Sequence, residues 1–197
     1  MTPTLSNANK RVFIIHGFDA HPRKHWFVWL KQRVENLGAS VEILSMPNPQ
    51  KPILEEWIGC IKHNVGMPNK DTFFVAHSLG TISTLRYIHA LKQDKQNPKI
   101  GGILLVSGFC SPLPSLPELD SFAKGDLDFA NIITRVKNRI VISAQDDEIV
   151  PYEFSKNLAQ NIEATFVGEP KGGHFMQSDG FDTFELLFAL LRLQLES

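Results

Sequence analysis

Six short apolar runs alternate with longer segments of helical period, and this alternation limits the possible folds more than any other feature of the sequence. The runs are rich in Val, Ile, Leu and Phe, as buried strands are, and they cover Arg11–His16, Ser40–Ser45, Thr72–Ala76, Gly102–Ser107, Arg139–Ala144 and Ala164–Gly168. The helical segments lie near His25–Leu37, Ile53–Val65, Leu79–Gln93, Tyr152–Asn161 and Phe181–Leu195. Such alternation is typical of a parallel sheet covered by helices on both faces. The sequence therefore predicts an α/β fold, a three-layer α/β/α sandwich with a mostly parallel central sheet.

The length of 197 residues suits one domain with a sizeable core. We expect the polar residues 1–10 to form a flexible N-terminal segment and residues 11–197 to form a single domain. In the third helical segment, apolar residues recur at every third position, which predicts one apolar stripe packed on the sheet. Only the stretch Pro112–Asn131 lacks a clear period. Folds of this class insert lids at that point, so any lid here is expected to be small.

The composition excludes several classes of partner. The chain carries 20 basic and 21 acidic side chains, so it has neither the positive charge nor the basic groove that nucleic acid requires. No stretch approaches the length of a membrane span, and the start of the chain does not resemble a secretion signal, which predicts a cytoplasmic protein. The spacing of Cys60 and Cys110 suggests no metal site, and we expect two buried free thiols.

The string TFFVAHSLG, which begins at Thr72, runs from a predicted strand through a tight turn into a predicted helix. A serine at such a turn projects its hydroxyl from the carboxyl edge of the sheet, with a helix N-terminus behind it. The positions two before and two after the serine must be small. Gly80 meets this demand, and Ala76 replaces the more usual glycine. The sequence thus indicates Ser78 as a nucleophile, and the alternative is that Ser78 only caps the helix.

A pair of carboxylates follows the fifth predicted strand, in the string RIVISAQDDEIVP. Catalytic groups of open α/β sheets collect at the carboxyl ends of strands, so an acid here can reach a histidine on a later loop. The spacing D-x-x-V-P favours Asp147. Asp146 remains an alternative, since a one-residue shift of the strand end exchanges which carboxylate points inward.

His174 lies in the glycine-rich string EPKGGHF, between the last predicted strand and the final helix. Glycines let the backbone bring an imidazole close to a serine. The chain order Ser78, Asp147, His174 is the order found in α/β-hydrolases, and each residue is at or just after a strand end. We therefore predict that His174 is the general base and Asp147 the acid that orients it.

Acyl transfer also needs hydrogen-bond donors for the oxygen that becomes negative in the tetrahedral intermediate. The N–H of Leu79, directly after the nucleophile, is one expected donor. The first predicted strand ends in the string IIHGF, and its loop is expected to supply the second donor, the N–H of Phe18. Both donors belong to the backbone.

Other residues are interpreted as structural. His21 and His25 are four positions apart and could share a helix face, but no third ligand completes a metal site. We interpret both as solvated or structural. Trp26, Trp29 and Trp57 are interpreted as core or pocket-wall residues rather than a stacking platform.

Taken together, the motifs make the chain resemble the small single-domain serine hydrolases related to bacterial YdeN and to retinoblastoma-binding protein nine, in particular the YdeN-type bacterial branch. The matching strings are IIHG, HWFVWL, MPNP, VAHSLG, ILLVSGF, DDEIVPY and GGHF, which are spread over nearly the whole chain. The resemblance implies a compact α/β-hydrolase fold with little or no cap and a Ser-Asp-His triad. It also implies that the acid is the second aspartate of the pair, Asp147.

The resulting hypothesis is a serine hydrolase that cleaves a small carboxylic ester or related acyl substrate through an acyl-enzyme on Ser78, with no metal or organic cofactor. One alternative is a non-catalytic protein-binding module on a hydrolase fold, since fold does not fix function. Another is an acyltransferase that uses the same three residues. The sequence does not identify the substrate, the oligomeric state or a protein partner.

Overall fold

The computed structural model describes residues 7–91 and 98–197, and within them six strands form one sheet in the order β2-β1-β3-β4-β5-β6. All neighbouring strands are parallel. The strands are β1 (Arg11–Ile15), β2 (Ser40–Leu44), β3 (Thr72–His77), β4 (Ile100–Val106), β5 (Val136–Ala144) and β6 (Thr165–Glu169). The predicted α/β class with a parallel central sheet is confirmed, and each predicted apolar run contains most of one strand.

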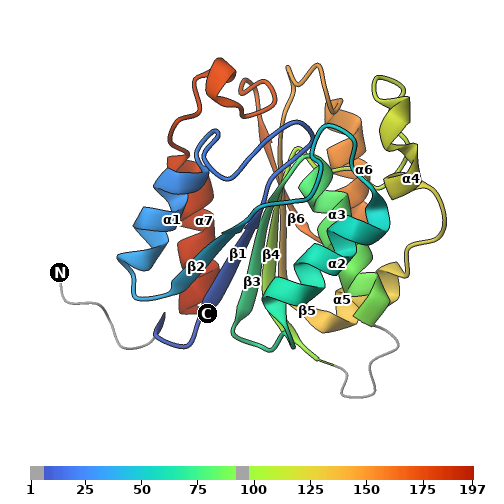
Figure 1. Ribbon diagram of the computed structural model, residues 1–197. Coiled ribbons are helices and arrows are strands. Elements are labelled where there is room, and N and C mark those ends of the chain that lie inside the picture. Colours follow the sequence, from blue (N-terminus) through green and yellow to red (C-terminus); the bar gives the residue numbers. More distant parts are fainter. Residues whose placement is uncertain (1–6, 92–97) are drawn as a thin grey trace.

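Helices cover both faces of this sheet, as Figure 1 shows. One face carries α1 (Phe27–Glu35) and α7 (Glu185–Glu196), and the other carries α2 (Leu54–Val65), α3 (Leu79–Ala90), α5 (Phe129–Arg135) and α6 (Tyr152–Asn161). Short elements complete the chain, namely the 3₁₀ helices η3 (Pro117–Leu119) and η4 (Gln177–Asp179) and the helix α4 (Asp120–Ala123). The molecule is therefore the predicted three-layer sandwich.

Two hydrophobic clusters lie between these layers because successive strand residues point to opposite faces. Val12 and Ile14 of β1 pack with α1 and α7, whereas Phe13 and Ile15 pack in the cluster that contains α2, α3 and α6. Both faces of the inner strands β1, β3 and β4 are thus buried, which explains why these strands read as continuous apolar runs rather than alternating ones.

The apolar stripe predicted for the third helix packs with strand residues in one cluster, but the burial of this helix extends beyond the stripe. Every residue of α3 from Leu79 to Ile88 is buried, because the helix packs on the sheet and is also contacted by α2, α4 and α5. Residues 92 and 93 of the predicted helix lie outside the described residues.

The stretch expected to hold at most a small lid contains only short elements, η3, α4 and the start of α5. Of the predicted N-terminal segment, residues 1–6 lie outside the described part. Asn7 is buried, its side-chain amide donates to the carbonyl of Leu37, and Lys10 forms an ion pair with Asp71. Across residues 7–91 and 98–197, the helices lack the length and apolarity that a membrane span requires.

Candidate active site

Ser78 lies at the turn between β3 and α3 with φ 53° and ψ −121°, a conformation that residues with a side chain rarely adopt. Its N–H donates to the carbonyl of Val106 at 2.9 Å, which ties the turn to the end of β4. Its carbonyl accepts from the N–H of Thr81, 2.9 Å away, at the start of α3. The strained serine is therefore held by the strand beside it and the helix after it, as the sequence predicts for a nucleophile elbow.

Two glycines allow the chain to pass close to Ser78. A side chain at Gly80 would place its Cβ 2.4 Å from the carbonyl oxygen of Ile15, so only glycine fits between α3 and β1. A Cβ at Gly17 would lie 2.9 Å from the Cβ of Ser78. The loop after β1 therefore runs directly past the serine, and it brings Phe18 to the same pocket.

His16 fixes the start of this loop through both of its ring nitrogens. The N–H of Met46 donates to Nε2 at 3.1 Å, so the proton of the neutral ring is on Nδ1, from which it is donated to the carbonyl of Gly17 at 2.8 Å. Burial lowers the pKa of His16, which keeps the ring neutral. His16 was not singled out from the sequence, although its place in the string IIHGF was a usable signal.

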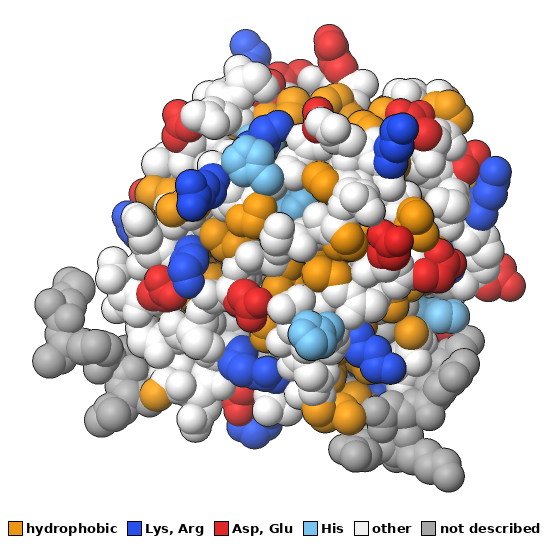
Figure 2. Space-filling model, viewed as in Figure 1, with side chains coloured by type: hydrophobic (Ala, Val, Ile, Leu, Met, Phe, Trp, Pro, Cys, Tyr) orange, Lys and Arg blue, Asp and Glu red, His pale blue; other side chains and the backbone are white. Residues whose placement is uncertain are grey.

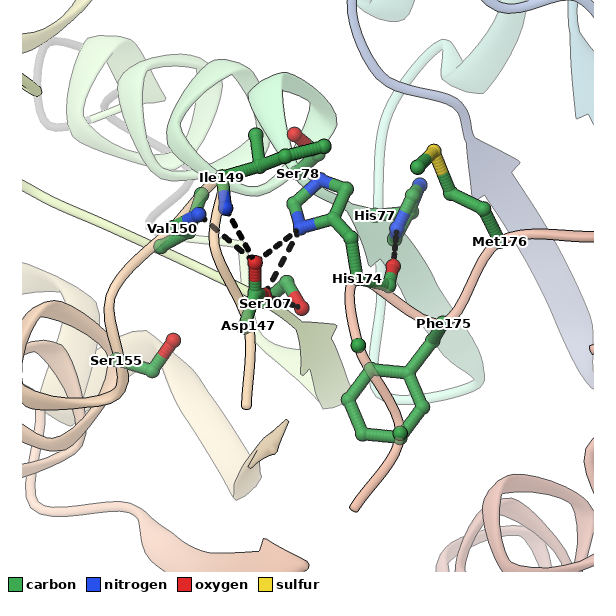
Figure 3. Close-up of polar contacts among 12 residues, drawn as sticks. His77, Ser78, Ser107, Asp147, Ile149, Val150, Ser155, His174, Phe175 and Met176 are labelled. Atoms are coloured by element: carbon green, nitrogen blue, oxygen red, sulfur yellow. Dashed lines mark hydrogen bonds and ion pairs between the residues drawn. The ribbon is translucent and has the colours of Figure 1, made fainter. Parts of the chain in front are cut away.

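The Asp147 carboxylate lies against the imidazole of His174, and Figure 3 shows the contact. Nδ1 of His174 is 2.9 Å from Oδ2 and 3.1 Å from Oδ1 of Asp147, and both side chains are buried. A carboxylate can only accept, so the ring donates from Nδ1 and keeps a lone pair on Nε2. The other edge of the ring belongs to the pocket that Ser78 also lines.

Three further donors hold the Asp147 carboxylate. Ser107 donates its hydroxyl to Oδ2 at 2.7 Å, and the N–H groups of Ile149 and Val150 both donate to Oδ1 at 2.9 Å. Ser107, at the end of β4, was not singled out from the sequence. Like Ser78, Ser107 has a positive φ, here 49°, and both residues directly follow a strand at the carboxyl edge of the sheet.

Asp146 has a different position from Asp147. Its Oδ1 accepts from the N–H groups of Gly172 and Gly173, at 2.9 and 2.8 Å, in the loop that carries His174. Of the two alternatives, Asp147 thus contacts the histidine ring, whereas Asp146 binds the backbone beside it.

His77 lines the pocket and contacts the same loop. Its Nε2 donates to the carbonyl of His174 at 2.8 Å, and the two rings are 4.8 Å apart. Burial, followed by the proximity of His174, lowers the pKa of His77 well below its ordinary value, so the ring is neutral. His77 therefore acts as a fixed donor to the backbone of the histidine loop.

The pocket around these residues has a volume of about 290 Å³ and is small and mainly apolar. That volume is at the lower end of the range of about 300 to 1,000 Å³ common for ligand sites. Apolar lining comes from Phe18, Ala20, Leu116, Ile149 and Met176, and polar lining comes from His25, His77, Ser78, Ser115, Glu148 and His174, together with Gly17. The pocket lies at the carboxyl ends of β1 and β3, where the strand order reverses direction, the usual ligand site of an open α/β sheet.

His25 lies at the pocket, although it was not singled out from the sequence as a site residue. It does not share a helix with His21, because α1 begins only at Phe27 and His25 has a φ of 55°. Its ring lines the pocket, and the residue is half-buried. Among the described residues, no three His, Cys, Asp or Glu side chains are grouped so that they could hold a metal ion.

Comparisons with known proteins agree with this architecture. A sequence model of the serine hydrolase family matches residues 12–193. YdeN of Bacillus subtilis (strain 168) is 43% identical over 182 residues, which is 92% of this chain and 94% of YdeN. The crystal structure of the ydeN gene product superposes with a TM-score of 0.91 at 41% identity, and covers 95% of this chain and 100% of that one.

A more distant structure, Est1E from Butyrivibrio proteoclasticus, has a TM-score of 0.68 at 16% identity, with 95% of this chain and 89% of that chain covered. At this identity the likeness concerns the fold. The expected resemblance to the YdeN branch is confirmed by the sequence and structural matches together. On these grounds the chain belongs to the serine hydrolase family and has an α/β-hydrolase fold.

Proposed function

We propose that the protein cleaves a small carboxylic ester, or a related acyl compound, through an acyl-enzyme on Ser78. The observation that carries the proposal is the buried pair of Asp147 and His174, 2.9 Å apart, whose imidazole lines the same pocket as the strained Ser78. Serine needs an adjacent base to become a nucleophile, and a base needs a group that fixes its tautomer. The proposal assigns these roles to His174 and Asp147.

In the proposed mechanism, Oγ of Ser78 attacks the ester carbonyl while Nε2 of His174 takes its proton. The N–H groups of Leu79 and Phe18 stabilise the oxyanion of the tetrahedral intermediate. Leu79 is the first residue of α3, so its N–H has no partner within the helix. Collapse of the intermediate breaks the ester bond, and the departing alkoxide takes the proton from His174. Water then attacks the acyl-enzyme by the same steps and releases the acid.

The size of the pocket supports short substrates, because about 290 Å³ leaves little room for a long acyl chain. A cytoplasmic location is part of the proposal. Cys60 and Cys110 are both free, which favours a reducing compartment over an oxidising one.

The test is covalent labelling with a fluorophosphonate, combined with hydrolysis of p-nitrophenyl esters of increasing chain length. Wild-type protein is expected to label and to hydrolyse short esters fastest, and Ser78→Ala should abolish both. Ser83→Ala is the matched control, since Ser83 is in the same helix but donates only to the carbonyl of Leu79.

If folded wild-type protein did not label, the proposal would fail and the non-catalytic binding module would be favoured. If Ser78→Ala still labelled, the assignment of the nucleophile would be wrong. A third outcome is that the protein labels and forms an acyl-enzyme but turns over only when an alcohol or amine acceptor is added. That outcome would identify an acyltransferase.

A further inference from the structure

His25 is held rigidly at the wall of the pocket. Its positive φ of 55° sets the ring against two others, and the ring centroids of Phe27 and His77 lie 5.4 and 5.6 Å away in edge-on arrangements. Non-glycine residues keep such a backbone conformation only where surrounding contacts enforce it, often at ligand sites. The imidazole therefore has a fixed orientation before any ligand arrives.

The tautomer of His25 is also fixed. The N–H of Gln177 donates to Nδ1 of His25 at 3.0 Å, so this nitrogen presents a lone pair and the neutral ring carries its proton on Nε2. Burial, followed by the charge of Lys24 and the proximity of His174, lowers the pKa of His25 to about 4, against a smaller opposing effect of Asp179. At neutral pH the ring is consequently an uncharged donor.

Within residues 7–91 and 98–197, no protein acceptor bonds to Nε2 of His25, although the ring lines the pocket. The neighbouring His77 already donates its own N–H to the carbonyl of His174. The backbone donors near Ser78 are assigned to the carbonyl under attack. The Nε2–H of His25 is thus an additional donor, which neither the histidine loop nor the carbonyl under attack uses.

The charges around the pocket restrict what this donor can bind. Neither Lys nor Arg is among the lining residues, His25 and His77 are neutral, and the exposed Glu148 lines the pocket, while Lys24, whose charge acts on His25, lies outside the lining. Within the lining, a carboxylate or phosphate on the substrate would meet the negative charge of Glu148 and no cation. The acceptor that suits His25 is therefore an uncharged oxygen.

We propose that His25 is a specificity-determining residue whose Nε2–H donates a hydrogen bond to a second, uncharged oxygen of the substrate, which makes short oxygen-bearing esters the preferred class. This inference rests on the proposed ester hydrolysis and adds a preference within it. A neutral hydrogen bond in such a site typically contributes about three- to tenfold in affinity.

Two isosteric pairs of esters test the proposal, because each pair differs only in the exchange of a CH₂ for an oxygen. p-Nitrophenyl butyrate and p-nitrophenyl methoxyacetate place the oxygen on the acyl side, and butyl butyrate and 2-methoxyethyl butyrate place it on the alcohol side. For each pair, the ratio of kcat/KM values is divided by the ratio of the hydroxide-catalysed rates, which removes intrinsic reactivity.

Wild-type protein is expected to favour the oxygen-bearing member of at least one pair by about three- to tenfold after this correction. His25→Phe, which keeps a ring and removes the donor, should bring the ratio to about 1, mainly through KM. His25→Gln, which keeps an N–H donor, should retain part of the preference. His21→Phe is the control and should leave the ratio unchanged, because His21 is exposed and outside the pocket lining.

A corrected ratio of about 1 in both pairs for wild-type protein would overturn the proposal without any variant. An unchanged preference in folded His25→Phe would do the same. In both of these cases the proposed function still stands if wild-type protein hydrolyses the plain butyrates and Ser78→Ala does not. If wild-type protein hydrolyses none of the esters, both proposals fail.

Discussion

Donors surround the Asp147 carboxylate on both of its oxygens. Oδ1 accepts from two backbone N–H groups, and Oδ2 accepts from the hydroxyl of Ser107 and from Nδ1 of His174. An amide in this place could present an oxygen to only one of these sets. The other set would face an NH₂ group, which cannot accept.

Replacement of Asp147 by Asn is therefore expected to disturb the tautomer of His174. If the amide NH₂ faces the ring, Nδ1 becomes the acceptor and Nε2 carries the proton, so His174 can no longer take the proton of Ser78. Loss of the acid in related triads costs about 10⁴-fold in kcat. We expect a decrease of that order for Asp147→Asn in steady-state ester hydrolysis.

Asp146→Asn is the matched comparison. Its side-chain oxygen can still accept from the N–H groups of Gly172 and Gly173, so we expect a much smaller decrease in kcat. Comparable losses in the two variants would show that the contact with the ring does not decide which aspartate is catalytic.

The strand pattern alone could not separate these two aspartates, for a physical reason. Strand β5 ends at Ala144, and a turn at Gln145 and Asp146 then determines which carboxylate faces inward. The geometry of this turn depends on hydrogen bonds to backbone N–H groups, those of Gly172 and Gly173 far along the chain and that of Val150 nearby. The apolar pattern of the strand does not reveal these hydrogen bonds. The spacing motif and the family resemblance favoured Asp147, and the observed contact agrees with them.

At the scale of elements, the loop between β6 and α7 is held through its backbone. Asp146 binds the N–H groups of Gly172 and Gly173, and Oδ2 of Asp179 binds those of His174 and Met176, both at 3.0 Å. The carbonyls of this loop are held as well, that of His174 by His77 and that of Phe175 by the indole N–H of Trp26. His174 itself lies outside any helix or strand, and hydrogen bonds to the loop backbone position its ring.

Removal of one of these carboxylates should misplace His174. Asp179→Ala leaves two backbone N–H groups without their acceptor, and a displacement of about 1 Å can cost up to about 10²-fold in rate. We expect kcat to fall by about 10- to 100-fold with a small change in KM, and Asp179→Asn to recover most of the loss, because its oxygen can accept both bonds.

Asp182→Ala is the control for this prediction, since Asp182 is exposed in the same segment. Equal kinetics for Asp179→Ala and Asp182→Ala would show that the two hydrogen bonds from the loop do not position the histidine.

Element boundaries deviated from the sequence prediction where tertiary contacts override periodicity. The final helix begins at Glu185 rather than near Phe181, because η4 and the packing of Phe181 and Phe184 around Phe175 occupy the preceding residues. The first helix begins at Phe27 because His25 turns into the pocket. Both differences occur at the carboxyl edge of the sheet, where residues form the pocket and its surroundings instead of extending the helices.

At the scale of the whole molecule, charged side chains of both signs are mixed over the face shown in Figure 2. This fits the nearly balanced composition. Three of the histidines at the pocket and the loop beside it have a pKa lowered mainly by burial, His16 and His77 being fully buried and His25 half-buried. The molecule thus folds with uncharged imidazoles around its candidate active site.

This arrangement predicts a loss of stability in acid. The pKa of each of these three histidines lies below its ordinary value of 6.5 in the folded protein, so the unfolded chain binds more protons below about pH 6.5. The free energy of unfolding should therefore be fully present above pH 6.5 and should decrease as the pH falls toward 4. Urea denaturation at pH 7.5, 6.0 and 5.0 measures this slope.

His77→Gln should lessen the slope between pH 6.5 and 5, even if it lowers stability at pH 7.5. Substitution of the exposed His63 to Asn is the control, and it should leave the slope as in wild type. A slope that is the same in all three proteins would assign the acid sensitivity to other groups.

The global architecture followed from the sequence because buried parallel strands and their crossover helices have distinct periods. The burial of α3 on all sides did not follow from it, since Thr81, Ser83 and Thr84 are polar in the sequence. Their hydroxyls donate to carbonyls of Ser78, Leu79 and Gly80 one helical turn earlier, which satisfies them without water. Because these residues are polar, the sequence did not indicate that their face of the helix is buried away from water.

This burial has a consequence for how the protein loses its site on heating. A helix enclosed on every side exchanges its amide hydrogens only when the whole domain opens, whereas loops with exposed backbone open at much lower cost. Ser78 is joined to such a helix, and His174 is on a loop. Inactivation that precedes global unfolding must then begin with the departure of the histidine, and the serine turn should be the last part of the site to come apart.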